Sequence, residues 1–160
     1  MRRTLQALVL VATLALPAAI SAAGTDGTLS VKRGRGLIVL KFKGTAIGRL
    51  ANGRVRIKDA TPFDDQITQF RNCRRFRYIN ASTAVCIGRN ISFRAVDGRY
   101  AVTVLGSGIY LSAVGRGTVL VDGAGDQGVA DGVMSIDDEP YQSLPDIATS
   151  FELGTTTSRR

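Results

Sequence analysis

The sequence predicts an all-β protein whose antiparallel strands form a sandwich or a small barrel. Apolar and polar residues alternate with a period of two in several short segments, which is typical of strands with one buried face. Glycine and other turn residues recur between these segments. No segment after Ala23 shows the apolar stripe of an amphipathic helix.

Three segments show the clearest alternation, and they are the strands expected first: Leu37–Lys43, Arg54–Lys58 and Arg99–Leu105. Successive side chains of a strand point to opposite faces, so every second residue of each segment is expected in the core. The residues expected inside are Ile38, Leu40, Phe42, Val55, Ile57, Tyr100, Val102 and Val104.

The chain also contains an internal repeat. The shift that places Gly36 on Gly98 also places Gly44 on Gly106 and Gly53 on Gly115. Each half, about 36–59 and 98–122, is expected to form three strands separated by glycine turns. Two such meanders facing each other would make the sandwich or barrel. A solenoid of short coils is the alternative, which is disfavoured because only two repeats are visible.

The C-terminal part is expected to complete a single β domain over residues 24–154. After the Gly/Asp-rich run that begins at Gly123, Val133–Ile136 reads as a strand. A turn follows at Asp138–Pro140, and Ser150–Leu153 reads as a last strand. Residues 155–160 are expected to form a frayed tail.

The N-terminal segment, residues 1–23, is typical of a signal peptide. Arg2 and Arg3 precede the apolar run Leu5–Ile20, and small residues lead to a predicted cleavage between Ala23 and Gly24. The alternative, a transmembrane anchor, needs a longer apolar run of about 20 residues. The protein is therefore expected to be secreted, without a stable membrane anchor, and extracellular or associated with the cell envelope.

The charge is basic and unevenly distributed. The formal net charge is +8; residues 24–116 hold 17 basic and 5 acidic side chains, and residues 117–160 hold 2 basic and 8 acidic ones. A basic region of this kind suits anionic partners. The acidic part is expected to attract it within the molecule, to keep it from binding polyanions indiscriminately, or simply to stay solvated.

The only two cysteines, Cys73 and Cys86, are expected to form a disulfide in an exported chain. They lie on the arms of a predicted hairpin that turns near Asn80–Ser82. Alternation places both sulfur atoms on the outer face. The residues expected inside are Phe70, Phe76, Tyr78, Val85 and Ile87. A redox-active pair is disfavoured because such cysteines usually stand closer, as Cys-x-x-Cys.

The same alternation predicts a basic strip on the outer face of this hairpin. Its candidate anion-binding residues are Arg71, Arg74, Arg75 and Arg77. Guanidinium groups hold phosphates and carboxylates through charge-assisted hydrogen bonds. The alternative is a merely solubilising face. Nucleic acid is not expected as a partner, because the aromatic residues that would stack on bases are predicted to point inward.

Composition argues against the common catalytic sites. The chain has no histidine, so Ser-His-Asp triads, Cys-His pairs and histidine-ligated zinc are excluded. No catalytic residue, metal ligand or cofactor is predicted. The alternative enzyme is a small carboxylate-dependent hydrolase, with Asp59, Asp64, Asp65 and Asp97 as candidates. Gly123–Gly128 matches a dinucleotide-binding glycine pattern, but no helix is predicted after it. The nearby acidic residues lack EF-hand spacing.

Several runs of sequence carry a resemblance. They are Asn90–Tyr100, Gly106–Val119, Glu139–Tyr141, Leu144–Pro145 and Ser150–Gly154. Their glycines and strand patterns resemble a group of small secreted actinobacterial proteins with no assigned activity. The resemblance implies export and a β fold and adds no function. The Cys73/Cys86 pair is not part of that pattern.

The sequence thus predicts a secreted, non-enzymatic β module that associates through a basic face with anionic envelope polymers or an acidic protein partner. One alternative is the carboxylate-dependent hydrolase. Another is a structural envelope component that assembles with itself through an exposed strand edge.

Overall fold

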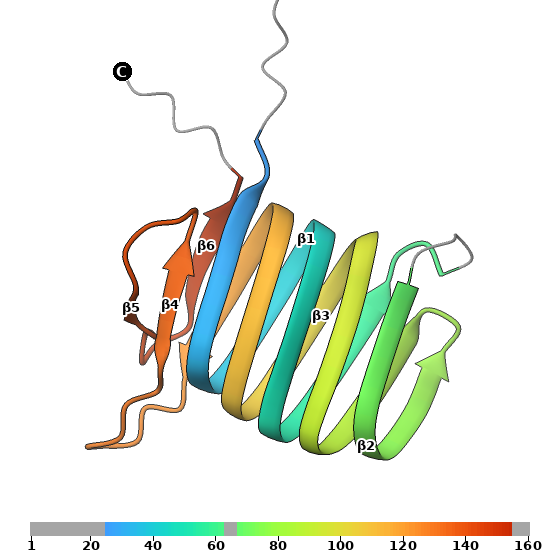
Figure 1. Cartoon of the computed structure of the whole chain (residues 1–160), viewed down its shortest axis with the longest axis horizontal. Coiled ribbons are helices and arrows are strands. Elements are labelled where there is room, and N and C mark those ends of the chain that lie inside the picture. The colour runs from blue at the N-terminus through green and yellow to red at the C-terminus, as the bar shows by residue number, and fades with distance from the viewer. Residues whose placement is uncertain (1–24, 63–66, 155–160) are drawn as a thin grey trace, which may run out of the picture.

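The computed structural model describes residues 25–62 and 67–154, and all its regular elements are strands (Figure 1). The strands are β1 (Gly27–Asp59), β2 (Ile67–Asn80), β3 (Thr83–Gly123), β4 (Val133–Ile136), β5 (Gln142–Ser143) and β6 (Thr149–Leu153). The predicted all-β, antiparallel class is confirmed. No helix is present among the described residues, so none there could cross a membrane.

The long strands β1 and β3 wind together into a flattened coil (Figure 1). They are antiparallel, and each has the other as its neighbour on both sides over much of its length. Gly106 of β3, for example, pairs with Gly36 on one side and with Gly53, further along β1, on the other. One turn of the coil at this point therefore takes the part of β1 that runs from Gly36 to Gly53.

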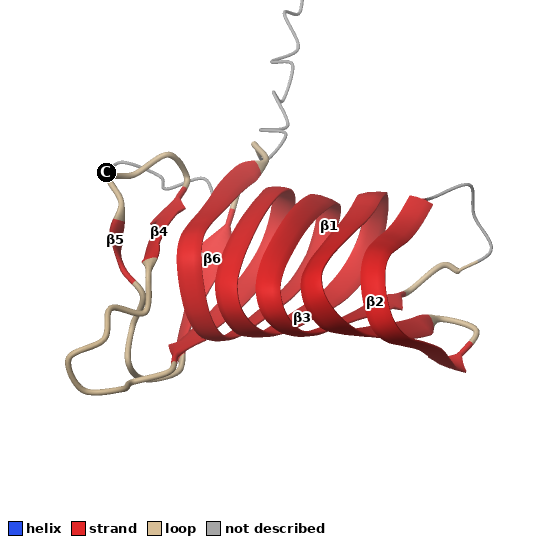
Figure 2. Ribbon diagram, turned by 60° about the horizontal axis from the view of Figure 1, so that its bottom comes forward, coloured by secondary structure: helices blue, strands red, loops and turns tan. Residues whose placement is uncertain are grey.

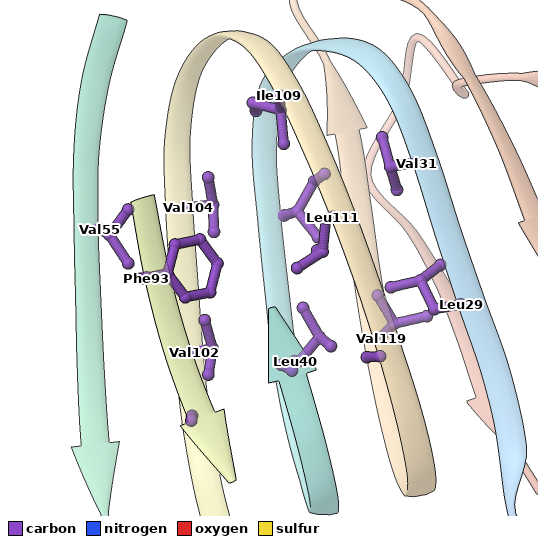
Figure 3. Close-up of a cluster of buried hydrophobic side chains, with 14 of the residues drawn as sticks. Leu29, Val31, Leu40, Val55, Phe93, Val102, Val104, Ile109, Leu111 and Val119 are labelled. Atoms are coloured by element: carbon purple, nitrogen blue, oxygen red, sulfur yellow. The ribbon is translucent and has the colours of Figure 1, made fainter. Parts of the chain in front are cut away.

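Each turn crosses the molecule twice, so the coil has two facing layers of strand segments with the core between them (Figure 2). Side chains from different turns, including Leu40, Val55 and Val102, meet in this interior (Figure 3). All eight inward residues predicted from the three alternating segments are buried, with at most 4% of any one exposed. Alternation therefore predicted the core face of these three segments correctly.

Glycines form the corners at which the chain passes between the layers. Gly44 pairs with Gly115 at one edge of the coil, and Gly53 pairs with Gly106 at the other. Gly44 has a φ of 152°, and a Cβ atom there would overlap the backbone carbonyl of Val114. Glycine permits both this conformation and the close approach of two backbones.

The strands are connected differently from a meander. At the corner glycines the chain does not reverse into a neighbouring strand but continues into the opposite layer. The internal repeat therefore superimposes the corners of β1 on those of β3, because both strands wind through one coil. The two facing layers agree with the predicted sandwich. The winding of the chain agrees with the alternative, a solenoid of short coils. The sheet is not closed, so the barrel alternative does not hold.

Short strands cover one end of the coil. β4 pairs with the start of β1 and β6 with the end of β3, whereas β2 pairs with β3 at the other end. The loop before β4 is fixed by Asp131, which is 7% exposed and accepts a 2.7 Å hydrogen bond from the Gly125 amide. The predicted strands Val133–Ile136 and Ser150–Leu153 are confirmed as β4 and as part of β6.

Some predictions fall outside the described residues. These are the signal peptide with its cleavage between Ala23 and Gly24, the frayed tail at 155–160, and two candidate acids, Asp64 and Asp65.

Candidate anion-binding face

The predicted disulfide between Cys73 and Cys86 is confirmed, and its Cα atoms are 5.2 Å apart. The faces predicted for the two cysteines, for Val85 and for Ile87 are wrong. Cys86 is fully buried in the core, and Cys73 packs against the core. Ile87, predicted to point inward, is 38% exposed. The disulfide therefore lies on the core side of the hairpin rather than on its outer face.

Two irregularities in the β2–β3 ladder explain this difference. The register shifts between Arg71 and Cys73 and again between Cys73 and Arg75. Asn72 has a φ of 62°, in the left-handed region that asparagine tolerates. Its side-chain Nδ2 donates a 2.9 Å hydrogen bond to the backbone carbonyl of Asn90. Each extra residue shifts the alternation by one, so Cys73 turns inward and Arg75 still faces outward.

After the second shift, β2 carries arginines on the outer face of one layer. Its Arg75 pairs with Ile87 of β3, and its Arg77 pairs with Val85. On the other side of β3 lies β1. Its Arg54 pairs with Ile87, and its Arg56 pairs with Val85. Two cross-strand rows result, each with an apolar residue between two arginines. We call the four exposed arginines the arginine face: Arg54, Arg56, Arg75 and Arg77.

The Cα atoms of the arginine face are regularly spaced because the face is built on a sheet. Residues two apart along a strand are about 7 Å apart, and residues two strands apart are about 10 Å apart. Val85 is only 4% exposed although it lies on this outer face, which indicates that neighbouring side chains cover it. A depression of about 290 Å³ lies between the rows and is lined in part by Arg54, Arg56, Arg77 and Ile87.

No residue of the arginine face makes an ion pair within the part of the chain that the structure describes. The ion pairs seen there join Arg35 to Asp126 and Asp131, and Arg116 to Asp26. Like charges held close together on one face repel one another and disfavour the folded state. A multivalent anion would offset this repulsion.

As far as residue 154, where the described chain ends, the acidic C-terminal part does not cover the arginine face. Its strands β4, β5 and β6 lie at the end of the coil opposite to β2. Among its described acids, Asp126 and Asp131 form ion pairs, and both pair with Arg35. The charge asymmetry of the sequence thus becomes a spatial asymmetry, with a basic β2 end and an acidic opposite end.

The predicted strip of four arginines does not stay together. Arg71 precedes the irregularity and pairs with Ser92 in the other layer. The backbone of Arg74 lies against Gly88 at a corner of the coil. Only Arg75 and Arg77 of the predicted residues belong to the arginine face.

Sequence reasoning missed the other half of the face, Arg54 and Arg56. The alternation in Arg54–Lys58 already indicated that these side chains point outward. It gave no sign that β1 and β2 flank the same segment of β3, because that pairing is a non-local contact.

The β2 end of the coil opens into a cavity of about 530 Å³, which we call the coil mouth. Phe70, Phe76 and Tyr78 share this side of β2, as predicted, with successive ring centroids 5.6 and 5.1 Å apart. Phe76 is nevertheless 47% and Tyr78 69% exposed, because no further turn of the coil covers them within the described parts of the chain. Phe76 and Tyr78 are thus only partly enclosed.

Of the two candidate acids of a hydrolase that the structure describes, Asp59 and Asp97, only Asp59 lines this cavity. Asp59 is the one carboxylate among the described residues that line it. Asp97 lies elsewhere, at a position of β3 with a φ of 51°. Glycosidase-type carboxylate chemistry uses a pair of acids across the reacting bond, and these two residues do not form such a pair in the coil mouth.

The outer face of the other layer carries cations that are already engaged with rings. Arg49 lies 4.5 Å from the centroid of the Tyr110 ring, and Lys32 lies 4.0 Å from that of Tyr141. The Tyr141 and Ser30 hydroxyl groups are 2.8 Å apart. The pKa of Tyr141 is lowered from its ordinary value, first by its hydrogen bond with Lys32 and then by that with Ser30.

The remaining motifs gain no support as sites. Gly123–Gly128 leads through a turn to β4 without an intervening helix. Among the residues that the structure describes, no three acidic or cysteine side chains are grouped closely enough to hold a metal ion.

Comparisons of the chain with protein-family models, with curated proteins and with solved structures find no match.

Proposed function

We propose that this protein is an exported, non-enzymatic binding module whose arginine face holds an anionic polymer of the cell envelope. The observation that carries the proposal is the arginine face itself: four exposed arginines in two rows, without a carboxylate partner among the described residues. The disulfide is compatible with an extracellular location. The resemblance to secreted actinobacterial proteins stays a prediction.

A polymer suits this face better than a small anion does. The Cα atoms that carry these side chains are spaced by about 7 and 10 Å, so a chain with regularly spaced charges can contact several arginines at once. Arginine binds phosphate and carboxylate groups through two parallel hydrogen bonds. The exposed part of Ile87 between one pair of arginines offers an apolar contact for the uncharged parts of such a chain.

The test is cosedimentation of the purified protein with purified anionic envelope material across a salt series. Retention should fall as salt rises, because binding through several charges releases counterions and is screened. A variant with Arg54, Arg56, Arg75 and Arg77 changed to Gln should lose retention at every salt concentration.

The control variant removes the same charge elsewhere, by changing Arg49, Arg89, Arg94 and Arg99 to Gln. These side chains are also exposed, and none belongs to the arginine face. The control should keep most of the retention. An equal loss in both variants would assign binding to net charge alone and reject the arginine face as a site.

A further inference from the structure

The β2 edge and the coil mouth together form a second binding surface, which shares Arg75 and Arg77 with the arginine face. We propose that this surface binds an extended, acidic segment of a partner protein, which joins the sheet as a further strand beside β2. Three observations lead to this proposal: an unpaired strand edge, a partly enclosed aromatic row, and the charge of β2.

The first observation is the edge. Among the described residues β2 pairs with β3 on one side and has no neighbouring strand on the other. An edge strand presents unpaired backbone N–H and C=O groups, and an extended peptide can satisfy them by strand addition. A polymer without a peptide backbone cannot reproduce this ladder of hydrogen bonds.

The second observation is the aromatic row of the coil mouth. Phe76 and Tyr78 lie where the next turn of the coil would cover them, and they are 47% and 69% exposed. A strand added at β2 would direct every second side chain toward this row. The cavity of about 530 Å³ has room for apolar side chains.

The third observation selects the chemistry of the occupant. β2 carries Arg71, Arg74, Arg75 and Arg77 and no acidic residue. A second copy of β2 would bring arginines against arginines, which is unfavourable. A strand with carboxylates on its outward positions would pair with them instead. The expected partner segment therefore alternates acidic and apolar residues.

The probe is a fluorescently labelled peptide that alternates glutamate and valine, with one phenylalanine at its centre. Its control has lysine in place of glutamate. Fluorescence anisotropy should detect binding of the acidic peptide and none of the basic one. Failure of the acidic peptide to bind would overturn the proposal.

Two protein variants locate the site. A Phe76→Ser, Tyr78→Ser variant should bind the acidic peptide at least about 30-fold more weakly, as is typical when central aromatic contacts are removed. A Tyr141→Ser variant changes a residue that is 45% exposed at the opposite end of the coil and should bind normally. Circular dichroism confirms that each variant is folded. Unchanged affinity in the folded double variant would overturn the coil mouth as the site.

Amide hydrogen exchange distinguishes strand addition from simple charge attraction. Bound peptide should slow exchange of β2 amides, whereas contact through arginine side chains alone should not. A variant with only Arg54 and Arg56 changed to Gln should keep peptide binding and lose polymer retention, so the two proposals can fail separately. Peptide binding without protection of β2, or pairing of two copies through β2 at low salt, would overturn strand addition.

Discussion

One methyl group at a corner of the coil should measurably weaken the fold. Gly44→Ala would place a Cβ atom against the Val114 carbonyl at a φ of 152°, a conformation that is nearly exclusive to glycine. We expect the free energy of unfolding to fall by about 3 kcal/mol in urea titrations. Gly128→Ala is the control: its φ is also positive, at 74°, but a Cβ atom there has no neighbour within 4 Å. It should lose about 1 kcal/mol. Equal losses would contradict close packing at the corners.

The contact of Tyr141 with Lys32 should be visible in an alkaline titration. Lys32→Met should raise the pKa of Tyr141 toward its ordinary value of 10.0, because the largest cause of the lowered pKa is removed. Ser30→Ala should raise the pKa less, because its hydrogen bond is the second cause. NMR titration of the Tyr141 ring measures both shifts. An unchanged pKa in the Lys32 variant would contradict the contact.

The same shift fixes the sign of its effect on stability. A lowered pKa in the folded state favours the tyrosinate, so it stabilises the fold fully above the pKa of the unfolded chain. This contribution is lost as the pH falls through the folded pKa. Lys32→Met should therefore reduce stability at strongly alkaline pH through this group and not at neutral pH.

Among the elements, the β2–β3 hairpin should depend most on a single covalent bond. The disulfide closes a separation of 13 residues, and the chain-entropy model assigns about 3 kcal/mol to such a loop. Reduction should lower the free energy of unfolding by about this amount. A Cys73→Ala, Cys86→Ala variant should lose more than reduction does, because Cys86 is fully buried and its sulfur packs in the core. Urea titrations with and without reductant measure both losses. Equal losses would mean that the sulfur adds nothing by packing.

The elements also show how far alternation can predict structure. Within the three segments with the clearest alternation the inward residues were predicted correctly, because every second side chain there faces the core without interruption. In β2 the inward and outward alternation of side chains is interrupted twice around Cys73. The asparagine at position 72, where φ is positive, is not enough to predict such an interruption from the sequence. The glycine spacing was visible, but a corner and a hairpin turn both need glycine. The winding of the coil depends on pairing between residues far apart in the sequence. The alternation of apolar and polar residues carries no information about which segments pair.

In the whole molecule, the coil has two unlike ends. A coil that exposes its last turn needs a terminal element to cover its core. Here β4, β5 and β6 cover the end where the chain is acidic, with β6 paired along Thr118 and Val119 of β3. The β2 end has no such covering strand among the described residues, and it carries arginines, a known means of keeping edge strands from pairing with each other. Arginines such as Arg75 and Arg77 thus both prevent self-association and attract anionic partners.

This double role predicts opposite responses to salt. Repulsion between β2 edges should keep the protein monomeric at low ionic strength, where charges are weakly screened. Rising salt should weaken polymer retention but permit some self-association, because screening reduces both attraction and repulsion. An Arg75→Gln, Arg77→Gln variant should associate already at low salt. Arg54→Gln, Arg56→Gln removes the same charge away from the edge strand and should stay monomeric. Sedimentation velocity across a salt series measures each case. Dimers of the unmodified protein at low salt, or equal association of both variants, would show that these arginines do not protect the edge.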